Sequence, residues 1–200
     1  GFGAYTNIQS LDVSVDDVVN DKYPKTEKVH KITENVLNIA RRIRNMMIYT
    51  HPETIQLQYD KAMDEAANIG PLMAYLDTTI TSEKGKELLA KLAKARESYV
   101  PVQQRALNMG LEHKKALEQG VEYDGTNLAD LIQGELRDKQ LTYTDALQEI
   151  IAYQDKLMED SGREASETAS NGIIIILALL GGSIVIAVVI AFIVTGSIVK

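Results

Sequence analysis

The sequence predicts an all-α protein: an antiparallel up-down-up-down four-helix bundle over residues 1–171, followed by one transmembrane helix over residues 172–199. Two observations support this fold. Apolar residues recur at alternating spacings of three and four through otherwise polar segments, which is typical of helices that pack along a seam. The segment that follows is apolar and uncharged, and no strand-like alternation competes with the helical pattern.

The first two helices are expected on either side of a proline. The seam of the first is Val29, Ile32, Val36, Ile39, Ile43 and Met46. The break at 50–53 contains Pro52, a residue tolerated at a helix start but not in its interior. The seam of the second is Ile55, Tyr59, Ala62, Ala66, Ile69, Met73 and Leu76. Gly70 and Pro71 predict a bend in this helix.

The third and fourth helices follow a break at 77–84, where Ser82 is the expected N-cap. The third seam is Leu88, Leu92, Ala95, Tyr99, Val102, Ala106 and Met109, and Pro101 predicts a kink in it. This helix should end near Gly120, before a turn at 124–127. The fourth is expected as one continuous helix with the seam Leu128, Ile132, Leu136, Tyr143, Ala146, Ile150, Tyr153 and Leu157.

Residues 172–199 contain no charged side chain. A bilayer core needs about 20 apolar residues in a helix, so this segment is long enough to span it. Lys200, the only charge after it, favours a cytoplasmic C-terminus. Because four helices return the chain to the side where it began, we expect an earlier span before Gly1 and an extracytoplasmic bundle between the two spans.

Composition narrows the functional classes. The chain has 21 basic and 28 acidic residues, a formal net charge of −7, which argues against nucleic-acid binding. It has no cysteine. Glu27 and His30 have the Glu-x-x-His spacing of di-iron bundles, but that chemistry needs two such motifs and only one is present. With no zinc pattern or phosphate-binding loop, we expect no enzyme activity, metal or cofactor.

Two segments resemble methyl-accepting chemotaxis proteins, whose periplasmic sensor is a four-helix bundle between two spans. They are Asn-Asp-Lys-Tyr-Pro-Lys at 20–25 and Asn-Ile-Ala-Arg-Arg-Ile-Arg-Asn-Met-Met at 38–47. The resemblance implies a periplasmic sensor domain anchored in the inner membrane, a homodimer, and a cytoplasmic kinase complex reached through a further C-terminal part. The same sensor type occurs on histidine kinases and cyclases, so this output is an expectation.

Folding the helices back on one another predicts one layer that contains Arg42, Arg96, Tyr99 and Tyr143. In this map Arg42 lies level with Lys61 of the second helix. A guanidinium binds a carboxylate through two parallel hydrogen bonds, so arginines from two helices predict a pocket for a small organic acid. The full candidate set is Arg42, Arg44, Arg96, Tyr99, Arg105 and Tyr143.

The predicted function is therefore a chemoreceptor sensor for di- or tricarboxylates such as malate, succinate or citrate, with aromatic carboxylates as second choice. The resemblance implies that, in related receptors, arginines of the first helix and of the same helix in a second copy bind the ligand. Arg41, Arg42 and Arg44 are more tightly spaced than that pattern. The alternatives are the sensor of a histidine kinase and a membrane-tethered structural or adhesion bundle.

Overall fold

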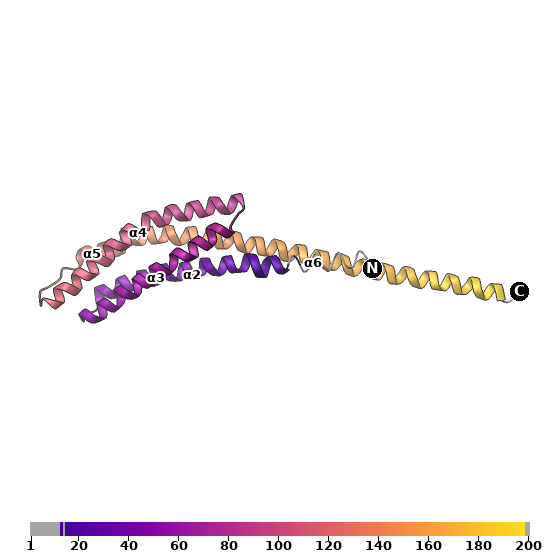
Figure 1. Ribbon diagram of the computed structural model, residues 1–200, viewed down its shortest axis with the longest axis horizontal. Helices are drawn as coiled ribbons and strands as arrows, with labels where there is room; N and C mark the ends of the chain where they lie inside the picture. Colours follow the sequence, from indigo (N-terminus) through magenta and orange to yellow (C-terminus); the bar gives the residue numbers. More distant parts are fainter. Residues whose placement is uncertain (1–12, 14, 199–200) are drawn as a thin grey trace. The chain divides into compact units, whose positions relative to one another are not determined.

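The computed structural model describes residue 13 and residues 15–198, with the backbone alone for residue 175 and from residue 179 onward (Figure 1). Its elements are the π-helix η1 (Asp17–Lys22) and the α-helices α2 (Tyr23–Ile48), α3 (Pro52–Thr79), α4 (Glu83–Glu118), α5 (Thr126–Gln133) and α6 (Glu135–Ile198). No strand occurs within this described part. The predicted all-α class is confirmed.

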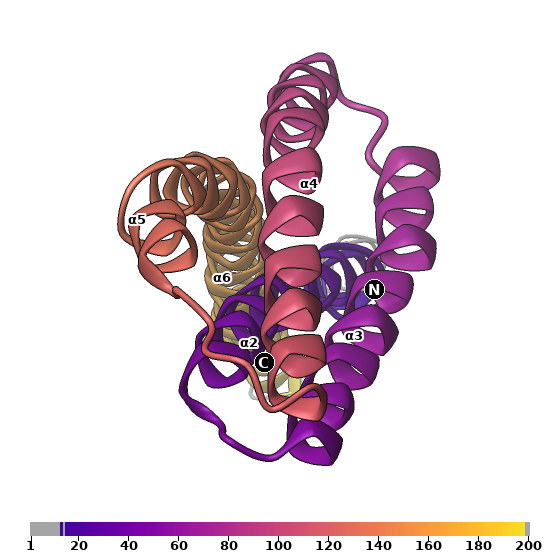
Figure 2. The same ribbon diagram turned by 90° about the vertical axis from the view of Figure 1, so that its left-hand side faces the viewer.

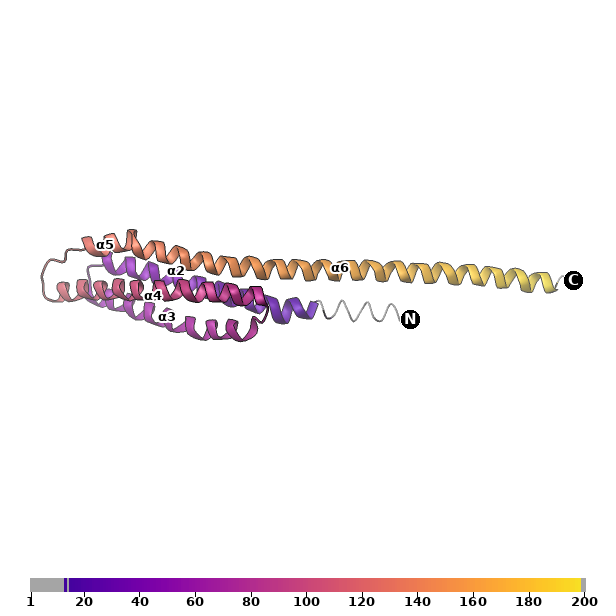
Figure 3. The same ribbon diagram turned by 90° about the horizontal axis from the view of Figure 1, so that it is seen from above.

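The chain divides into two compact units, each described by itself. The larger unit is Pro24–Asp155. In it α2, α3, α4 and the first part of α6 run alongside one another in alternating directions, which confirms the up-down-up-down bundle (Figure 3). The smaller unit combines Gly1–Tyr23 with Lys156–Lys200. There Lys22 of η1 forms an ion pair with Asp17 and donates a hydrogen bond of 2.7 Å to the Ser161 hydroxyl.

The heptad seams form the core of the larger unit. All the seam residues predicted for the first helix are fully buried in α2. The seams of α3 and α4 contribute Ile55, Ala62, Leu76, Leu92, Tyr99 and Ala106, which are also fully buried. Burial of a Leu, Ile or Val side chain contributes about 1.5–3 kcal/mol, so these seams supply the main stabilisation of the bundle.

The predicted ends of α3 and α4 agree with local chemistry. Pro52 is the first residue of α3. Ser82 is the N-cap of α4, and its hydroxyl accepts a hydrogen bond of 3.2 Å from the backbone N–H of Gly85. After α4, Gly120 has a φ of 65°, a conformation that favours glycine at a helix C-terminus.

The fourth bundle helix is interrupted, contrary to the prediction of one continuous helix. Gly134 separates α5 from α6 with a φ of −103° and a ψ of −108°. A Cβ at this position would lie 3.0 Å from the Asp130 carbonyl oxygen, so the break suits glycine. The two prolines do not end their helices: Pro71 lies within α3 and Pro101 within α4.

Most of the predicted membrane span, residues 172–199, consists of residues whose side chains the structure does not describe. Their backbone continues α6 to Ile198. Within the described residues, none of the helices is apolar over a stretch long enough to cross a bilayer.

Candidate functional site

Two buried tyrosines mark the layer that the sequence predicted. The ring centroids of Tyr99 on α4 and Tyr143 on α6 lie 5.6 Å apart, and the rings are tilted by 39°. Tyr99 is fully buried and Tyr143 is 1% exposed. Neither hydroxyl has a hydrogen-bond partner of normal geometry within the described part of the chain. The predicted level of these two residues is therefore confirmed, and the layer holds two polar atoms without a partner.

Two of the candidate arginines, Arg44 and Arg96, affect the pKa values of these tyrosines. Burial raises the pKa of Tyr143 to about 12, and the nearby Arg96 guanidinium opposes that rise because it favours the phenolate. Burial, and then the neighbouring Tyr143, raise the pKa of Tyr99, whereas Arg44 opposes this rise. Both phenols are therefore neutral near pH 7. The structure brings together Arg44, Arg96, Tyr99 and Tyr143 in one region of the bundle.

Arg42 lies at the predicted level but contacts α3. It donates hydrogen bonds of 3.2 Å to Gln58 Oε1 and 3.2 Å to Glu65 Oε1. Gln58 and Glu65 flank position 61, which the layer map placed opposite Arg42. The Arg42 and Glu65 side chains are only 18% and 15% exposed, so this ion pair is largely shielded from water. The charge of Arg42 is thus neutralised inside the protein, and its predicted ligand contact stays a prediction.

Arg105 lies away from the tyrosine layer, on the surface between α4 and α6. It forms an ion pair with Glu135, the first residue of α6. Their side chains are 53% and 47% exposed, and an exposed pair of this kind contributes about 0–1 kcal/mol. This contact links the two helices beside the break at Gly134.

The strongest feature for ligand binding is a pocket between α2 and the α5–α6 segment, which we call the arginine groove. Its volume is about 470 Å³, and it is lined by Arg44, Ile132, Gln133, Arg137, Gln140 and Leu141. No carboxylate lines it. Among the described residues, neither Arg44 nor Arg137 has an ion-pair partner, in contrast to Arg42 and Arg105. The groove therefore combines two unneutralised guanidiniums with two amides, a donor set suited to an anion.

Of the residues that line the groove, the sequence analysis proposed Arg44 as a site residue and Ile132 as a seam residue, and it missed Gln133, Arg137, Gln140 and Leu141. Arg137 and Gln140 are three residues apart on one face of α6, next to the seam residue Leu136. That pattern was visible in the sequence. The break at Gly134 was not expected, and it sets how Gln133 at the end of α5 lies beside Arg137 near the start of α6.

Comparison with protein families agrees with this architecture. Residues 1–169 match the model of the four-helix-bundle sensory module for signal transduction. A search of curated proteins gives no match. The family match covers nearly the whole bundle and confirms the resemblance inferred from residues 20–47. The chain therefore belongs to the family of four-helix-bundle sensory modules found in methyl-accepting chemotaxis receptors.

Proposed function

We propose that this chain is the extracytoplasmic ligand-sensing part of a chemoreceptor in the inner membrane, and that the arginine groove binds small aliphatic di- or tricarboxylates. The family match supports a sensory role. The observation that favours this ligand class is the presence of Arg44 and Arg137, from two different bundle helices, on one groove without a carboxylate partner. Two carboxylates of one ligand would each pair with one guanidinium.

The groove favours aliphatic over aromatic acids. Its volume of about 470 Å³ exceeds the size of malate, succinate or citrate and leaves room for water. No aromatic side chain lines it. Tyr99 and Tyr143 lie in the core, where they are unable to stack on a ligand from the surface. Gln133 and Gln140 offer both donors and acceptors, which suits a hydroxyl group such as that of malate.

The second surface of α2 supports a homodimer. Its exposed residues Leu37, Arg41, Arg44 and Ile48 follow spacings of four, three and four, the pattern of a second seam. Leu37 is 48% and Ile48 66% exposed. We propose that a second copy packs on this seam, which would bring the Arg41 and Arg44 side chains of both copies near the grooves. A cytoplasmic kinase complex would then receive the signal through α6, with no catalysis by this chain.

A thermal-shift screen of the full chain in mild detergent tests this function. We expect malate, succinate or citrate to raise the melting temperature more than benzoate does. Arg44→Gln should abolish most of this shift, whereas Arg163→Gln, which removes an exposed arginine that does not line the groove, should retain it. A shift that survives in Arg44→Gln would place the ligand elsewhere. If none of these acids raises the melting temperature, the result favours a structural or adhesion bundle instead.

A further inference from the structure

A loop joins the end of α3 to the start of α4 (Figure 2). A second pocket lies between these two helices, next to this loop. Its volume is about 500 Å³. We call it the α3–α4 groove, defined by Met73, Ala74, Asp77, Lys86, Leu89, Ala90 and Ala93. None of these residues belongs to the arginine groove, and none was a candidate from the sequence.

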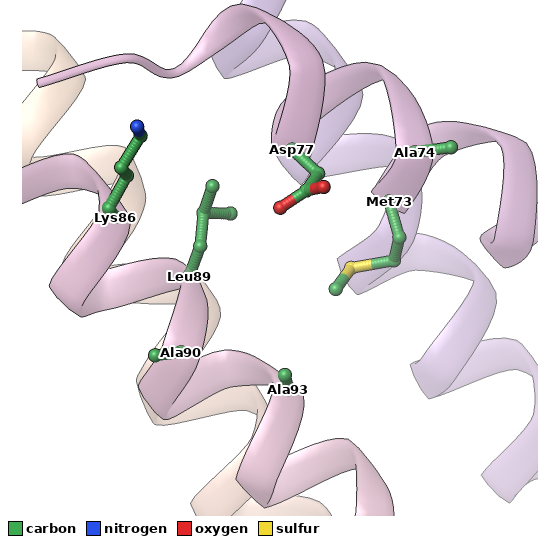
Figure 4. A pocket seen from close by; sticks show the side chains of 7 residues that line it. All are labelled: Met73, Ala74, Asp77, Lys86, Leu89, Ala90 and Ala93. Atoms are coloured by element: carbon green, nitrogen blue, oxygen red, sulfur yellow. The ribbon is translucent and has the colours of Figure 1, made fainter.

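Small side chains leave this groove open. Ala74 of α3 and both Ala90 and Ala93 of α4 extend little into the space between the two helices. Figure 4 shows Met73 and Asp77 directed from α3 toward α4, with Leu89 opposite them. The floor is therefore apolar, since Met73 and Leu89 supply most of the larger surface. Such a surface favours an aliphatic group of a ligand.

The charged residues lie at one end of the α3–α4 groove. Asp77 is near the end of α3 and Lys86 is near the start of α4, on either side of the connecting loop. Within the described structure, neither side chain forms an ion pair or hydrogen bond with the protein, and both are exposed. One negative and one positive group are thus available together, while Met73, Ala90 and Ala93 lie one to two turns deeper.

We propose that the α3–α4 groove is a second ligand site, and that it binds an α-amino acid with an apolar side chain. The ammonium group pairs with Asp77 and the carboxylate with Lys86. Because both groups of an α-amino acid are carried on one carbon, they match two opposite charges at the same end of a groove. The aliphatic side chain then contacts Met73, Leu89 and Ala90.

The site borders a contact with the signalling helix. The Ser82 hydroxyl, in the loop beside the groove, lies 3.0 Å from the Tyr153 hydroxyl of α6. Ser82 also caps α4 through Gly85, the residue before Lys86. A ligand that holds Asp77 and Lys86 together would stabilise this loop and its contact with α6.

The test measures L-leucine binding to the full chain in mild detergent by isothermal titration calorimetry. Two analogues each lack one charge: 4-methylpentanoate has no ammonium and 3-methylbutylamine has no carboxylate. We expect leucine to bind and each analogue to bind up to about fivefold more weakly, as loss of a pair with one exposed charge predicts. Asp77→Asn and Lys86→Gln should each weaken leucine binding by about the same factor.

Two variants that remove charges outside the α3–α4 groove, and one variant in the arginine groove, serve as controls. Asp64→Asn and Lys94→Gln remove exposed charges from α3 and α4 outside the groove and should leave leucine binding unchanged. Arg44→Gln should also leave it unchanged, which separates this site from the arginine groove. Circular dichroism checks that each variant folds.

Three results would overturn the proposal. The first is no leucine binding up to about 10 mM, a concentration that would reveal even a weak site. The second is binding of either analogue as tightly as leucine. The third is a change in oligomeric mass with Asp77→Asn or Lys86→Gln, which would show that a second copy covers the groove.

Discussion

The hydroxyl of Tyr143 is a buried polar atom whose removal should not weaken the protein. Because this hydroxyl has no hydrogen-bond partner of normal geometry and interacts only with the nearby Arg96 guanidinium, it recovers little of the bonding with water that it loses on folding. We expect Tyr143→Phe to raise the free energy of unfolding at pH 7 by about 1 kcal/mol. Urea unfolding followed by circular dichroism measures this change. A loss of stability would show that the hydroxyl is held by Arg96, water or a ligand.

The same tyrosine predicts a dependence on alkaline pH. Its pKa is about 12 in the folded protein against an ordinary value of 10.0, so the unfolded chain releases this proton first as pH rises. Folding stability therefore falls between these two pH values, by about 1.4 kcal/mol per pH unit for this group. The Tyr143→Phe variant lacks this loss. The difference between its free energy of unfolding and that of the unaltered chain should therefore grow from pH 10 to 11. A difference that stays constant would contradict the assigned cause.

Arg42 and Glu65 form a shielded ion pair whose partners depend on each other. Arg42→Met leaves the Glu65 carboxylate, 15% exposed, without its charge partner, and should cost about 2 kcal/mol of unfolding free energy. Arg42→Met combined with Glu65→Leu removes both charges and should recover most of this loss. Urea unfolding of the single and double variants separates the two effects. Equal losses in both would show that packing, and not the unpaired charge, determines the cost.

At the scale of elements, the connection between α3 and α4 requires glycine at position 85, three residues after Ser82, the N-cap of α4. A Cβ on Gly85 would lie 2.3 Å from Ile80 Cγ2 and 2.7 Å from the Ser82 hydroxyl oxygen. Gly85→Ala should therefore destabilise the bundle by about 1–3 kcal/mol, because the loop and cap must move.

Gly162→Ala is the control for this prediction. Nothing lies within 4 Å of a Cβ at this position, which is inside α6. Alanine should be stabilising there by about 0.5–1 kcal/mol, since glycine loses more backbone freedom in a helix. Thermal unfolding followed at 222 nm compares the two variants. A Gly85→Ala protein as stable as the unaltered chain would show that the loop has another conformation available.

The heptad pattern predicted the bundle helices and many of their buried residues, because side chains spaced by three and four share one helix face, but it did not predict η1 or the break at Gly134. It also gave the relative height of residues on neighbouring helices, as the contacts of Arg42 with positions 58 and 65 and of Tyr99 with Tyr143 show. It did not give the direction of a long side chain. Arg42, for which a ligand contact was predicted, is directed to Gln58 and Glu65 of α3, and this direction depends on the rotation of α3 about its axis.

At the scale of the whole molecule, the features that suit a sensor lie on its surface grooves and not in its core. The core is filled by seam residues, whereas Arg44 and Arg137 keep their charges at a groove between α2 and α6. A ligand that binds both would favour one arrangement of these helices, and it would shift the equilibrium only by its difference in affinity for the two arrangements.

A double-mutant cycle on these two arginines tests the central claim most directly. The ligand is whichever of malate, succinate and citrate gives the largest thermal shift, and its dissociation constant is measured for the full chain, Arg44→Gln, Arg137→Gln and the double variant. We predict that each single change weakens binding about tenfold and that the double change weakens it by less than the product, because one ligand bridges both groups. Dissociation constants equal to that of the unaltered chain in both single variants would contradict the account.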